Sequence, residues 1–249
     1  MVEVFNLILD WVYPPACIAC RALLPLNDAA RRASYFCEHC ESLPEVIGLP
    51  VCRVCGAPSS DDIDVCGNCI NRRYSFTCNH AAFVYEGILQ EILRDIKFRN
   101  RRRGAEGLGA LWARALADKP VPEADYIVPL PMHRKKQRQR GFNQAEIMAK
   151  YLSELYEIPM ISALERTRNT PPQSGLSTSR RADNVRGVFE VADEYVENLV
   201  GKKIILVDDI FTTGASLNEC ANILKLHGVG EVQTMTLCIA VRGGGSLLS

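Results

Sequence analysis

Two adjacent carboxylates, Asp208 and Asp209, stand where a run of apolar residues ends in the segment IILVDDIFTTGAS of residues 204–216. Carboxylates at the end of a buried strand can accept hydrogen bonds from sugar hydroxyls or attract a divalent cation. The threonines and glycine that follow lead into a helix N-terminus, where free amides and hydroxyls can hold a phosphate. The segment therefore predicts a ligand that carries both a phosphate and a pair of vicinal hydroxyls.

Two other interpretations of this segment are weaker. A nucleotide hydrolase also has a strand that ends in acids, but it needs a G-x-x-x-x-G-K-[ST] loop, and the sequence contains none. Acids placed by chance before a helix would leave the combination of strand, Asp-Asp, Thr-Thr-Gly and helix unexplained. We therefore expect the segment to form a ligand site at the carboxyl edge of a sheet.

Eleven cysteines are present, and most of them occur in C-x-x-C pairs. The paired residues are Cys17 and Cys20, Cys37 and Cys40, Cys52 and Cys55, and Cys66 and Cys69. Two such pairs make a closed tetrahedral Zn²⁺ site, so we predict two structural zinc ions. A disulfide framework would need an oxidising compartment, and no export signal supports one. Pairing of consecutive C-x-x-C units is favoured, and interleaved pairing stays open.

Basic residues concentrate in two segments, although the formal net charge of the chain is zero. Residues 134–140 contain five Lys or Arg and no acid, which suits a diphosphate group; a solvated charged turn is the other interpretation. Residues 94–103 contain six Lys or Arg, one Asp and Phe98, which suits the backbone of single-stranded DNA. The candidate DNA contacts are Lys97, Arg99, Arg101, Arg102 and Arg103.

Alternating strands and helices must position these residues. Apolar patterns predict strands over 80–87, 125–131, 185–191, 202–209 and 232–241. Helical spacing is found over 88–102, 108–117, 143–155 and 215–228, with Gly228 ending the last helix. Such alternation predicts an α/β fold with a parallel sheet that has helices on both faces. The 166–187 stretch is long for a connection, which predicts a binding loop or a merely flexible insert.

The chain of 249 residues divides into two predicted parts. Residues 1–75 form a small module with little hydrophobic core, which depends on metal to fold, and residues 76–249 form the α/β domain. The N-terminal residues predict a short amphipathic helix that stops at Pro14 and Pro15. No segment is long and apolar enough to span a membrane, and we expect a cytoplasmic protein.

Several motifs together resemble one known family. The segment IILVDDIFTTGAS resembles the phosphoribosyl pyrophosphate signature of type I phosphoribosyltransferases, and VPLPMHRKKQRQRGFNQA (128–145) resembles the strand–loop–helix segment of the ComF family. The cysteine pairs, IKFRNRRRGAEGLG and RTRNTPPQSGLSTSRRADNVRGVF (166–189) are similar to the double-zinc-ribbon phosphoribosyltransferases of that family. The resemblance covers nearly the whole chain. It implies a type I phosphoribosyltransferase fold, with a central parallel sheet and a hood, preceded by the zinc module.

The resemblance also implies roles for individual residues. Asp208 and Asp209 would hold the ribose hydroxyls of phosphoribosyl pyrophosphate, whose diphosphate carries Mg²⁺. The 5′-phosphate would contact Thr212, Thr213, Gly214 and Ser216, and the diphosphate would contact Arg134, Arg138, Arg140 and Gly141. A mobile flap formed by the 166–187 stretch would contribute Arg166, Gln173, Arg180 and Asn184.

Two functions follow from these expectations. One is transfer of a phosphoribosyl group to an acceptor with loss of pyrophosphate, although no set of residues identifies the acceptor. The other is binding of single-stranded DNA, because relatives in the ComF family are tied to DNA uptake in natural transformation, alongside a helicase-like partner. Salt-dependent DNA binding, measured beside pyrophosphate release, discriminates between the two functions.

Overall fold

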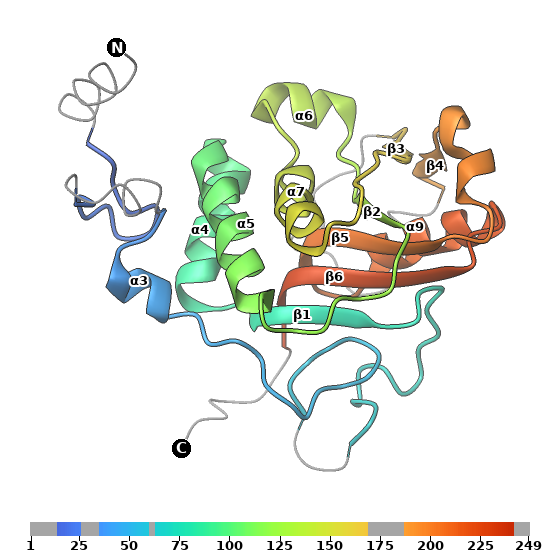
Figure 1. The fold of residues 1–249 in the computed structure, drawn as a ribbon, viewed down its shortest axis with the longest axis horizontal. Coiled ribbons are helices and arrows are strands. Elements are labelled where there is room, and N and C mark those ends of the chain that lie inside the picture. Colours follow the sequence, from blue (N-terminus) through green and yellow to red (C-terminus); the bar gives the residue numbers. More distant parts are fainter. Residues whose placement is uncertain (1–13, 26–34, 60–62, 169–186, 242–249) are drawn as a thin grey trace.

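A four-stranded parallel sheet with the strand order β1-β6-β5-β2 lies at the centre of the protein (Figure 1). The computed structural model describes residues 14–25, 35–59, 63–168 and 187–241. The sheet strands are β1 (Asn79–Val84), β2 (Tyr126–Pro129), β5 (Lys203–Phe211) and β6 (Glu231–Ile239). A separate antiparallel pair consists of β3 (Leu164–Arg166) and β4 (Phe189–Val191).

Side chains of β5 alternate between two buried faces of the sheet, as the period of a strand requires. The helices are α3 (Glu38–Ser42), α4 (Gly87–Arg99), α5 (Arg102–Leu116), α6 (Arg134–Arg140), α7 (Gln144–Tyr156) and α9 (Ala215–Leu226), with 3₁₀ turns at Asp193–Tyr195 and Glu197–Leu199. Ile205 and Val207 belong to the core beneath α4, α5 and α7, whereas Ile204 and Leu206 belong to the core beneath α9. The predicted parallel sheet with helices on both faces is therefore confirmed.

The connections that follow β2 and β5 run to opposite faces of the sheet. After β2 the chain continues through α6 to α7, whereas β5 leads directly to α9 on the other face (Figure 1). The two strands are neighbours, and their last register pair is Pro129 with Val207. Ligands of open α/β sheets bind in the crevice where neighbouring strands diverge in this way. Asp208 and Asp209 come immediately after that last pair.

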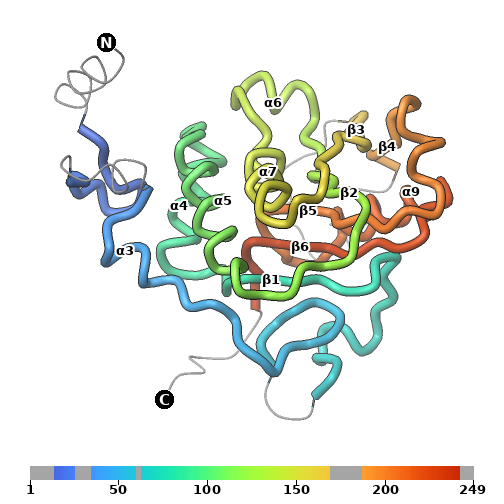
Figure 2. The backbone as a smooth tube through the Cα atoms, in the orientation of Figure 1, coloured from blue at the N-terminus to red at the C-terminus, as the bar shows by residue number. Residues whose placement is uncertain are grey.

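The first ribbon, which comprises the described residues 14–25 and 35–43, packs on α4 and α5 (Figure 2). Cys17, Ile18 and Cys40 lie in the same core as Trp112 of α5. A Cβ at Gly107 of α5 would lie 2.5 Å from Cδ1 of Ile18, so the close approach of the ribbon requires glycine at this position.

The second ribbon, which comprises the described residues 51–59 and 63–71, packs on the side of the sheet that carries α9. Cys52, Cys55 and Cys69 belong to the same core as Phe76 and Phe211. The buried apolar side chains in the described residues of both ribbons thus belong to the cores that also cover the sheet.

Several predicted elements differ from the observed ones. The basic segment 134–140 is helix α6 rather than a loop, and Gly141 ends it with a φ of +84°. The strand predicted over 185–191 is described only as Phe189–Val191, and it pairs with β3 outside the main sheet. The helix predicted over the first thirteen residues lies outside the described part of the chain. Within the described residues, no helix combines the length and apolar character needed to cross a bilayer.

Candidate functional site

The two adjacent acids of β5 face opposite sides of the sheet. Asp209 continues the row of Ile205 and Val207 towards α4 and α7, whereas Asp208 continues the row of Ile204 and Leu206. The strand does not end at the acids as predicted, because β5 remains paired with β6 as far as Phe211. On its other side β5 has lost its partner β2, so both acids border the crevice between these strands.

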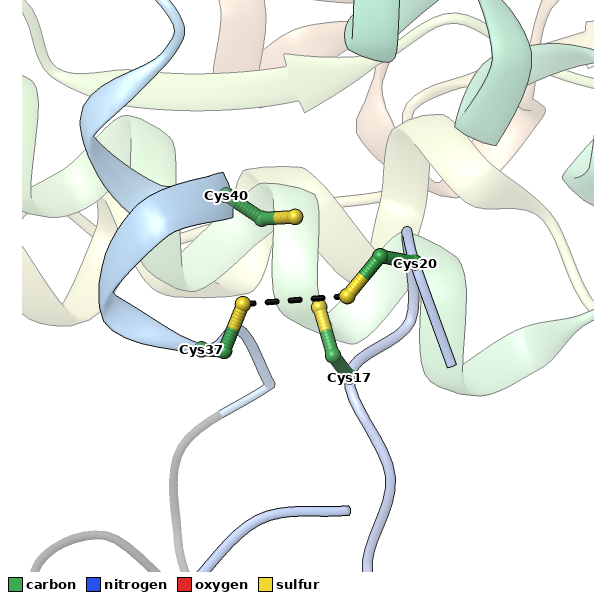
Figure 3. A group of neighbouring side chains, drawn as sticks. All are labelled: Cys17, Cys20, Cys37 and Cys40. Atoms are coloured by element: carbon green, nitrogen blue, oxygen red, sulfur yellow. Dashed lines mark hydrogen bonds between the residues drawn. The ribbon is translucent and has the colours of Figure 1, made fainter. Parts of the chain in front are cut away.

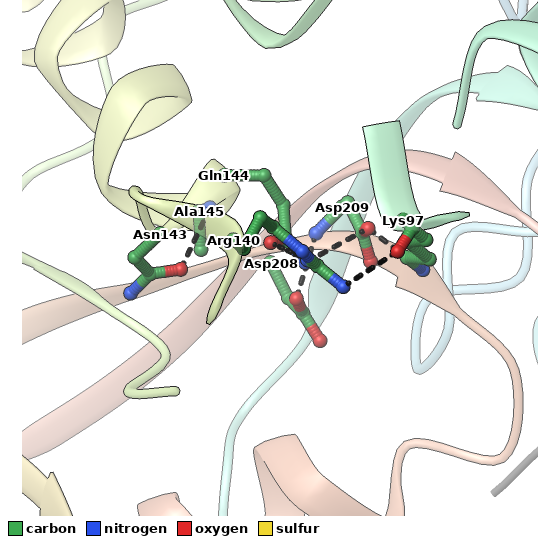
Figure 4. A network of polar contacts seen from close by, with 7 residues as sticks. All are labelled: Lys97, Arg140, Asn143, Gln144, Ala145, Asp208 and Asp209. Atoms are coloured by element: carbon green, nitrogen blue, oxygen red, sulfur yellow. Dashed lines mark hydrogen bonds and ion pairs between the residues drawn. The ribbon is translucent and has the colours of Figure 1, made fainter. Parts of the chain in front are cut away.

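Asp209 is buried in a polar network that joins α4, α6 and α7 (Figure 4). Its Oδ2 lies 2.8 Å from Nζ of Lys97 and accepts a hydrogen bond of 3.3 Å from Nε2 of Gln144. Arg140 donates to the Lys97 carbonyl oxygen at 3.3 Å and to Oε1 of Gln144. Burial is the largest single effect on Lys97 and opposes its charge, but the charge and the hydrogen bond of Asp209, together with the charge of Asp208, raise the pKa of Lys97 above its ordinary value.

Asp208 is half-buried, and Oδ1 of its side chain accepts a hydrogen bond of 2.8 Å from the Asp209 N–H. Burial and the neighbouring charge of Asp209 raise the pKa of Asp208 to about 7, against the opposing effect of Lys97. The charge of Asp208 also acts on Arg166 and on Cys220, which places this acid between β3 and α9. Because Asp208 takes part in the network of Lys97 only indirectly, its carboxylate is the more available of the two to a ligand.

The T-T-G loop, residues 212–214, joins β5 to the N-terminus of α9. Thr212 is exposed, Thr213 is buried, and Gly214 has a φ of +69°. Oγ1 of Thr213 accepts a hydrogen bond of 3.4 Å from the Ala215 N–H in the first turn of α9, and Ser216 in the same turn is half-buried. A left-handed residue directly before a helix of this length makes a concave arrangement of amides that suits a phosphate.

Helix α6 contributes its basic residues unequally. Arg134 donates to both carboxylate oxygens of Glu165 in β3, at 2.8 and 2.9 Å. Arg138 is exposed, and Arg140 turns towards Asp209. Burial lowers the pKa of Arg140, and the charge of Asp209 opposes this effect. A cavity of about 320 Å³ lies between α6, α7 and β3, and Arg134, Asn143 and Arg166 are among the residues that line it.

Only part of the predicted flap is described. Arg166 ends β3, lies over the ring of Phe189 at 5.4 Å, and has its pKa lowered by burial. Gln173, Arg180 and Asn184 lie outside the described residues, so their roles remain predictions.

The eight paired cysteines form two compact groups of four, Cys17, Cys20, Cys37 and Cys40 (Figure 3), and Cys52, Cys55, Cys66 and Cys69. Within each group the sulfur atoms lie within 4.8 Å of one another. The Sγ atoms of Cys20 and Cys37, and those of Cys55 and Cys66, are 3.7 Å apart. Tetrahedral zinc with Zn–S bonds of about 2.3 Å requires sulfur atoms about 3.8 Å apart. Both groups fit zinc, and consecutive pairing of the C-x-x-C units is confirmed.

The candidate DNA contacts divide into two sets. Lys97 binds Asp209 inside the crevice, whereas the arginines lie on the surface near the first ribbon. Asp95 pairs with Arg99 at 3.3 Å, with Arg101 at 3.5 Å and with Arg21 of the first ribbon at 3.0 Å. Arg102 pairs with Glu106, and Arg103 lies over the ring of Tyr35. Phe98 beside them is 79% exposed.

Three contacts of the site were not expected from the sequence. Lys97 and Gln144 contact Asp209 although both are distant from it in the sequence. Tyr74 contacts the T-T-G loop, where its Oη donates to the Thr213 carbonyl oxygen at 3.1 Å. Lys97 stood in a basic run that suggested surface contacts, and no local pattern connects Tyr74 with Thr213.

Two family models match the chain: a double zinc ribbon domain over residues 8–70 and a phosphoribosyl transferase domain over residues 138–246. Competence protein F of Haemophilus influenzae is 30% identical over 90% of this chain and 96% of its own length. The DNA utilization protein YhgH of Escherichia coli K12 is 28% identical over 90% and 97%. Purine phosphoribosyltransferase from Pyrococcus horikoshii is 17% identical, with a TM-score of 0.32 over 57% of this chain and 75% of its own.

Proposed function

Because the chain belongs to the family of competence protein F, which combines a double zinc ribbon with a phosphoribosyltransferase domain, we propose that it binds phosphoribosyl pyrophosphate and transfers the phosphoribosyl group to an acceptor. One observation carries the proposal. Asp208, the T-T-G loop and Arg140 all lie at the edge of the sheet where β2 and β5 diverge, which is where such sheets bind ligands, and these groups suit a diol, a phosphate and a diphosphate.

Each group has a part in the proposed reaction. The amides and hydroxyls of the T-T-G loop hold the 5′-phosphate at the positive end of α9. Asp208 accepts hydrogen bonds from the ribose, and its negative charge stabilises the positive charge that develops at the anomeric carbon. The oxygens of Asp208 are also of the kind that a hard cation such as Mg²⁺ prefers, and such an ion would neutralise charge on a leaving diphosphate.

The electrostatics of Arg140 favour an anionic ligand on the α6 side of the crevice. Its guanidinium is partly removed from water, and Lys97 already neutralises Asp209 at 2.8 Å. Within the described part of the chain, the side chain of Arg140 bonds a carbonyl oxygen and an amide oxygen rather than a carboxylate. A diphosphate would add a negative charge beside it and would match the forked geometry of its donors.

The test is calorimetric titration of the full chain with phosphoribosyl pyrophosphate and Mg²⁺, followed by a screen of candidate acceptors for pyrophosphate release. Arg140→Ala should weaken binding at least about tenfold, as expected for loss of a charge-assisted hydrogen bond. Lys225→Ala is the matched control, because Lys225 lies in the last turn of α9, away from the T-T-G loop. Absence of binding to the wild-type protein would rule out the proposal.

A second function, binding of single-stranded DNA, is favoured by a different observation. Phe98 is 79% exposed between Lys97 and Arg99, and an exposed ring among arginines can stack on a base while the arginines contact phosphates. The names of the two relatives, competence protein F and DNA utilization protein, agree with such a partner. A helicase-like competence protein, the other partner that the family resemblance implies, stays a prediction.

Fluorescence anisotropy of a labelled oligothymidylate tests this second function. Phe98→Ala should weaken binding by about 1–3 kcal/mol, the range measured for single stacked bases, without changing the salt dependence. Equal affinity of the wild type and the variant would exclude stacking on Phe98.

A further inference from the structure

The strap, residues 72–76, leaves the second ribbon just after its last cysteine and contacts the T-T-G loop. The N–H of Arg72 donates to the Cys69 carbonyl oxygen at 2.9 Å, so the strap begins within the metal-binding turn. Its guanidinium donates to the Thr213 carbonyl oxygen at 3.3 Å and to Oη of Tyr74 at 3.4 Å. Tyr74 donates to the same carbonyl oxygen at 3.1 Å. Two donors from the ribbon side therefore hold one peptide of the loop.

Aromatic packing fixes the strap against the end of β5. Tyr74 stacks on Phe76 with ring centroids 4.6 Å apart, and both rings meet Phe211 edge-on at 6.3 and 6.2 Å. A Cβ at Gly214 would lie 2.7 Å from Cζ of Phe211 and 3.1 Å from Cε1 of Tyr74. The loop and the strap are thus in close contact over several atoms.

The strap also reaches the first turn of α9. The Ser75 N–H donates to Oδ1 of Asn218 at 2.7 Å, and the Asn218 N–H donates to the Gly214 carbonyl oxygen at 2.7 Å. The strap therefore contacts the T-T-G loop directly at Thr213 and, through Asn218, at Gly214.

The peptide bond between Thr213 and Gly214 is planar, so the direction of its carbonyl fixes the direction of its N–H. The Thr213 carbonyl and the Gly214 N–H belong to one trans peptide and point in opposite directions. Because Arg72 and Tyr74 hold the carbonyl towards the ribbon, the Gly214 N–H points away from the ribbon. A charged donor on the carbonyl also polarises the peptide, which makes this N–H a better donor to an anion.

We propose that Arg72 and Tyr74 are positioning residues that couple the metal state of the second Cys₄ group to the phosphate-binding geometry of the T-T-G loop. The phosphate part of this inference rests on the proposed function. Small Cys₄ modules need metal to fold, so loss of metal removes the anchor of the strap at Cys69. The first ribbon packs on α4 and α5, and its described residues make no hydrogen bond to the T-T-G loop, so under this proposal its metal does not control the loop.

Two cysteine variants give a matched comparison. Cys37 and Cys66 are both half-buried, and each has its Sγ 3.7 Å from a partner cysteine of its own group. Cys66→Ser should remove one equivalent of zinc and increase amide hydrogen exchange over residues 212–216 in the full chain without ligand. Cys37→Ser should remove one equivalent and leave exchange at 212–216 unchanged. Equal exchange in the two variants would overturn the coupling.

A milder variant separates positioning from folding. Tyr74→Phe keeps the ring stack and both zinc ions but loses one donor to Thr213, and adding Arg72→Ala removes the second donor. We expect amide exchange at 212–216 to rise in the single and in the double variant. Affinity for phosphoribosyl pyrophosphate with Mg²⁺ should fall about threefold in the single variant and about tenfold in the double variant. Tyr74→Phe combined with Arg72→Lys, in place of Arg72→Ala, should have part of the lost affinity restored.

Exchange at 212–216 that matches the wild type in the double variant would overturn the inference. Failure of the wild-type protein to bind phosphoribosyl pyrophosphate would instead overturn the proposed function. The exchange measurements decide the coupling without any ligand, so the two failures are distinguishable.

Discussion

Replacing the two neighbouring acids by Asn, one at a time, should shift stability in opposite directions. In Asp208→Asn the amide oxygen can still accept the Asp209 N–H at 2.8 Å, but the buried negative charge is lost. In Asp209→Asn the ammonium of Lys97, 2.8 Å away, loses its partner. Asp208→Asn removes a buried negative charge that destabilises the folded protein, so it should stabilise it. Asp209→Asn leaves the positive charge of Lys97 without its carboxylate partner, so it should destabilise the folded protein.

The magnitude for Asp208 follows from its pKa, which is raised from 3.8 to about 7 by burial and by the charge of Asp209. The folded protein therefore holds more protons than the unfolded protein between these values, and its free energy of unfolding falls as pH rises through this window. Each unit of pKa corresponds to about 1.4 kcal/mol, so the upper limit over the whole window is about 4 kcal/mol. Between pH 5.5 and 7 the loss should reach at most about 2 kcal/mol.

The magnitude for Asp209 follows from its ion pair. Removing one partner of a buried pair costs about 3–5 kcal/mol, and partial exposure of the other partner reduces the cost. The Lys97 side chain is 32% exposed, whereas that of Asp209 is 5% exposed. We therefore expect Asp209→Asn to destabilise the protein by about 1–3 kcal/mol at pH 7.5.

Urea unfolding in half-unit pH steps from 5.5 to 7.5, followed by circular dichroism with zinc held constant, measures both effects. The wild type should lose stability with rising pH, and Asp208→Asn should show a flatter profile that crosses above it. A profile for Asp208→Asn parallel to that of the wild type would refute the raised pKa. Equal destabilisation by both substitutions would refute the placement of the acids on opposite faces.

Three further outcomes are expected. Elemental analysis should find two zinc ions per chain, and native disulfides among the eight paired cysteines would contradict this. Gly214→Ala should abolish titratable binding of phosphoribosyl pyrophosphate, because its φ of +69° and a Cβ 2.7 Å from Phe211 force the T-T-G loop to move; normal binding would exclude the loop from the site. Replacing Arg99, Arg101, Arg102 and Arg103 by Ala should weaken binding of oligothymidylate and reduce the slope of log affinity against log salt concentration. The reduction should correspond to fewer than four phosphate contacts, because acids already pair with Arg99, Arg101 and Arg102. An unchanged slope would remove these residues from the DNA interface.

The main elements of the sheet were predictable because burial leaves a strong pattern. The apolar run that contains residues 204–207 is buried on both faces and predicted β5, and the apolar spacing of 215–228 predicted α9 with its end near Gly228. Helix α6 was not predictable from spacing, since none of its residues is buried and no apolar stripe marks it. Strand β3 has three residues, which is too short for an alternation to show.

The local part of the site was predictable for a similar reason. The acids and the T-T-G loop are consecutive in the sequence, so strand, turn and helix could be recognised together. The partners of that segment come from distant parts of the chain, as Lys97, Gln144 and Tyr74 do. The residues next to a basic or aromatic side chain in the sequence do not indicate which distant residue it will contact. Only the folded structure brings the two partners together. The exposed arginines show the same limit, because the pair of Asp95 with Arg99 has helical spacing whereas the pair of Asp95 with Arg21 does not.

The alternation of side chains along β5 explains how two adjacent acids acquire different environments. One residue of a strand cannot share a face with the next, so Asp209 is directed to the helices that carry Lys97 and Gln144, and Asp208 is directed to the side of α9. Asp209 thereby joins α4 and α7 to the strand, and Lys97 compensates its charge within the protein. Asp208 keeps a charge that the protein disfavours, and its raised pKa means that a cation or a hydrogen-bond donor bound beside it would shift this carboxyl towards its charged form near neutral pH. The two acids that were expected to hold the ribose together therefore differ in availability. Asp209 is engaged by Lys97 and Gln144, and under the proposed function Asp208 is the carboxylate that a diol or a cation would contact.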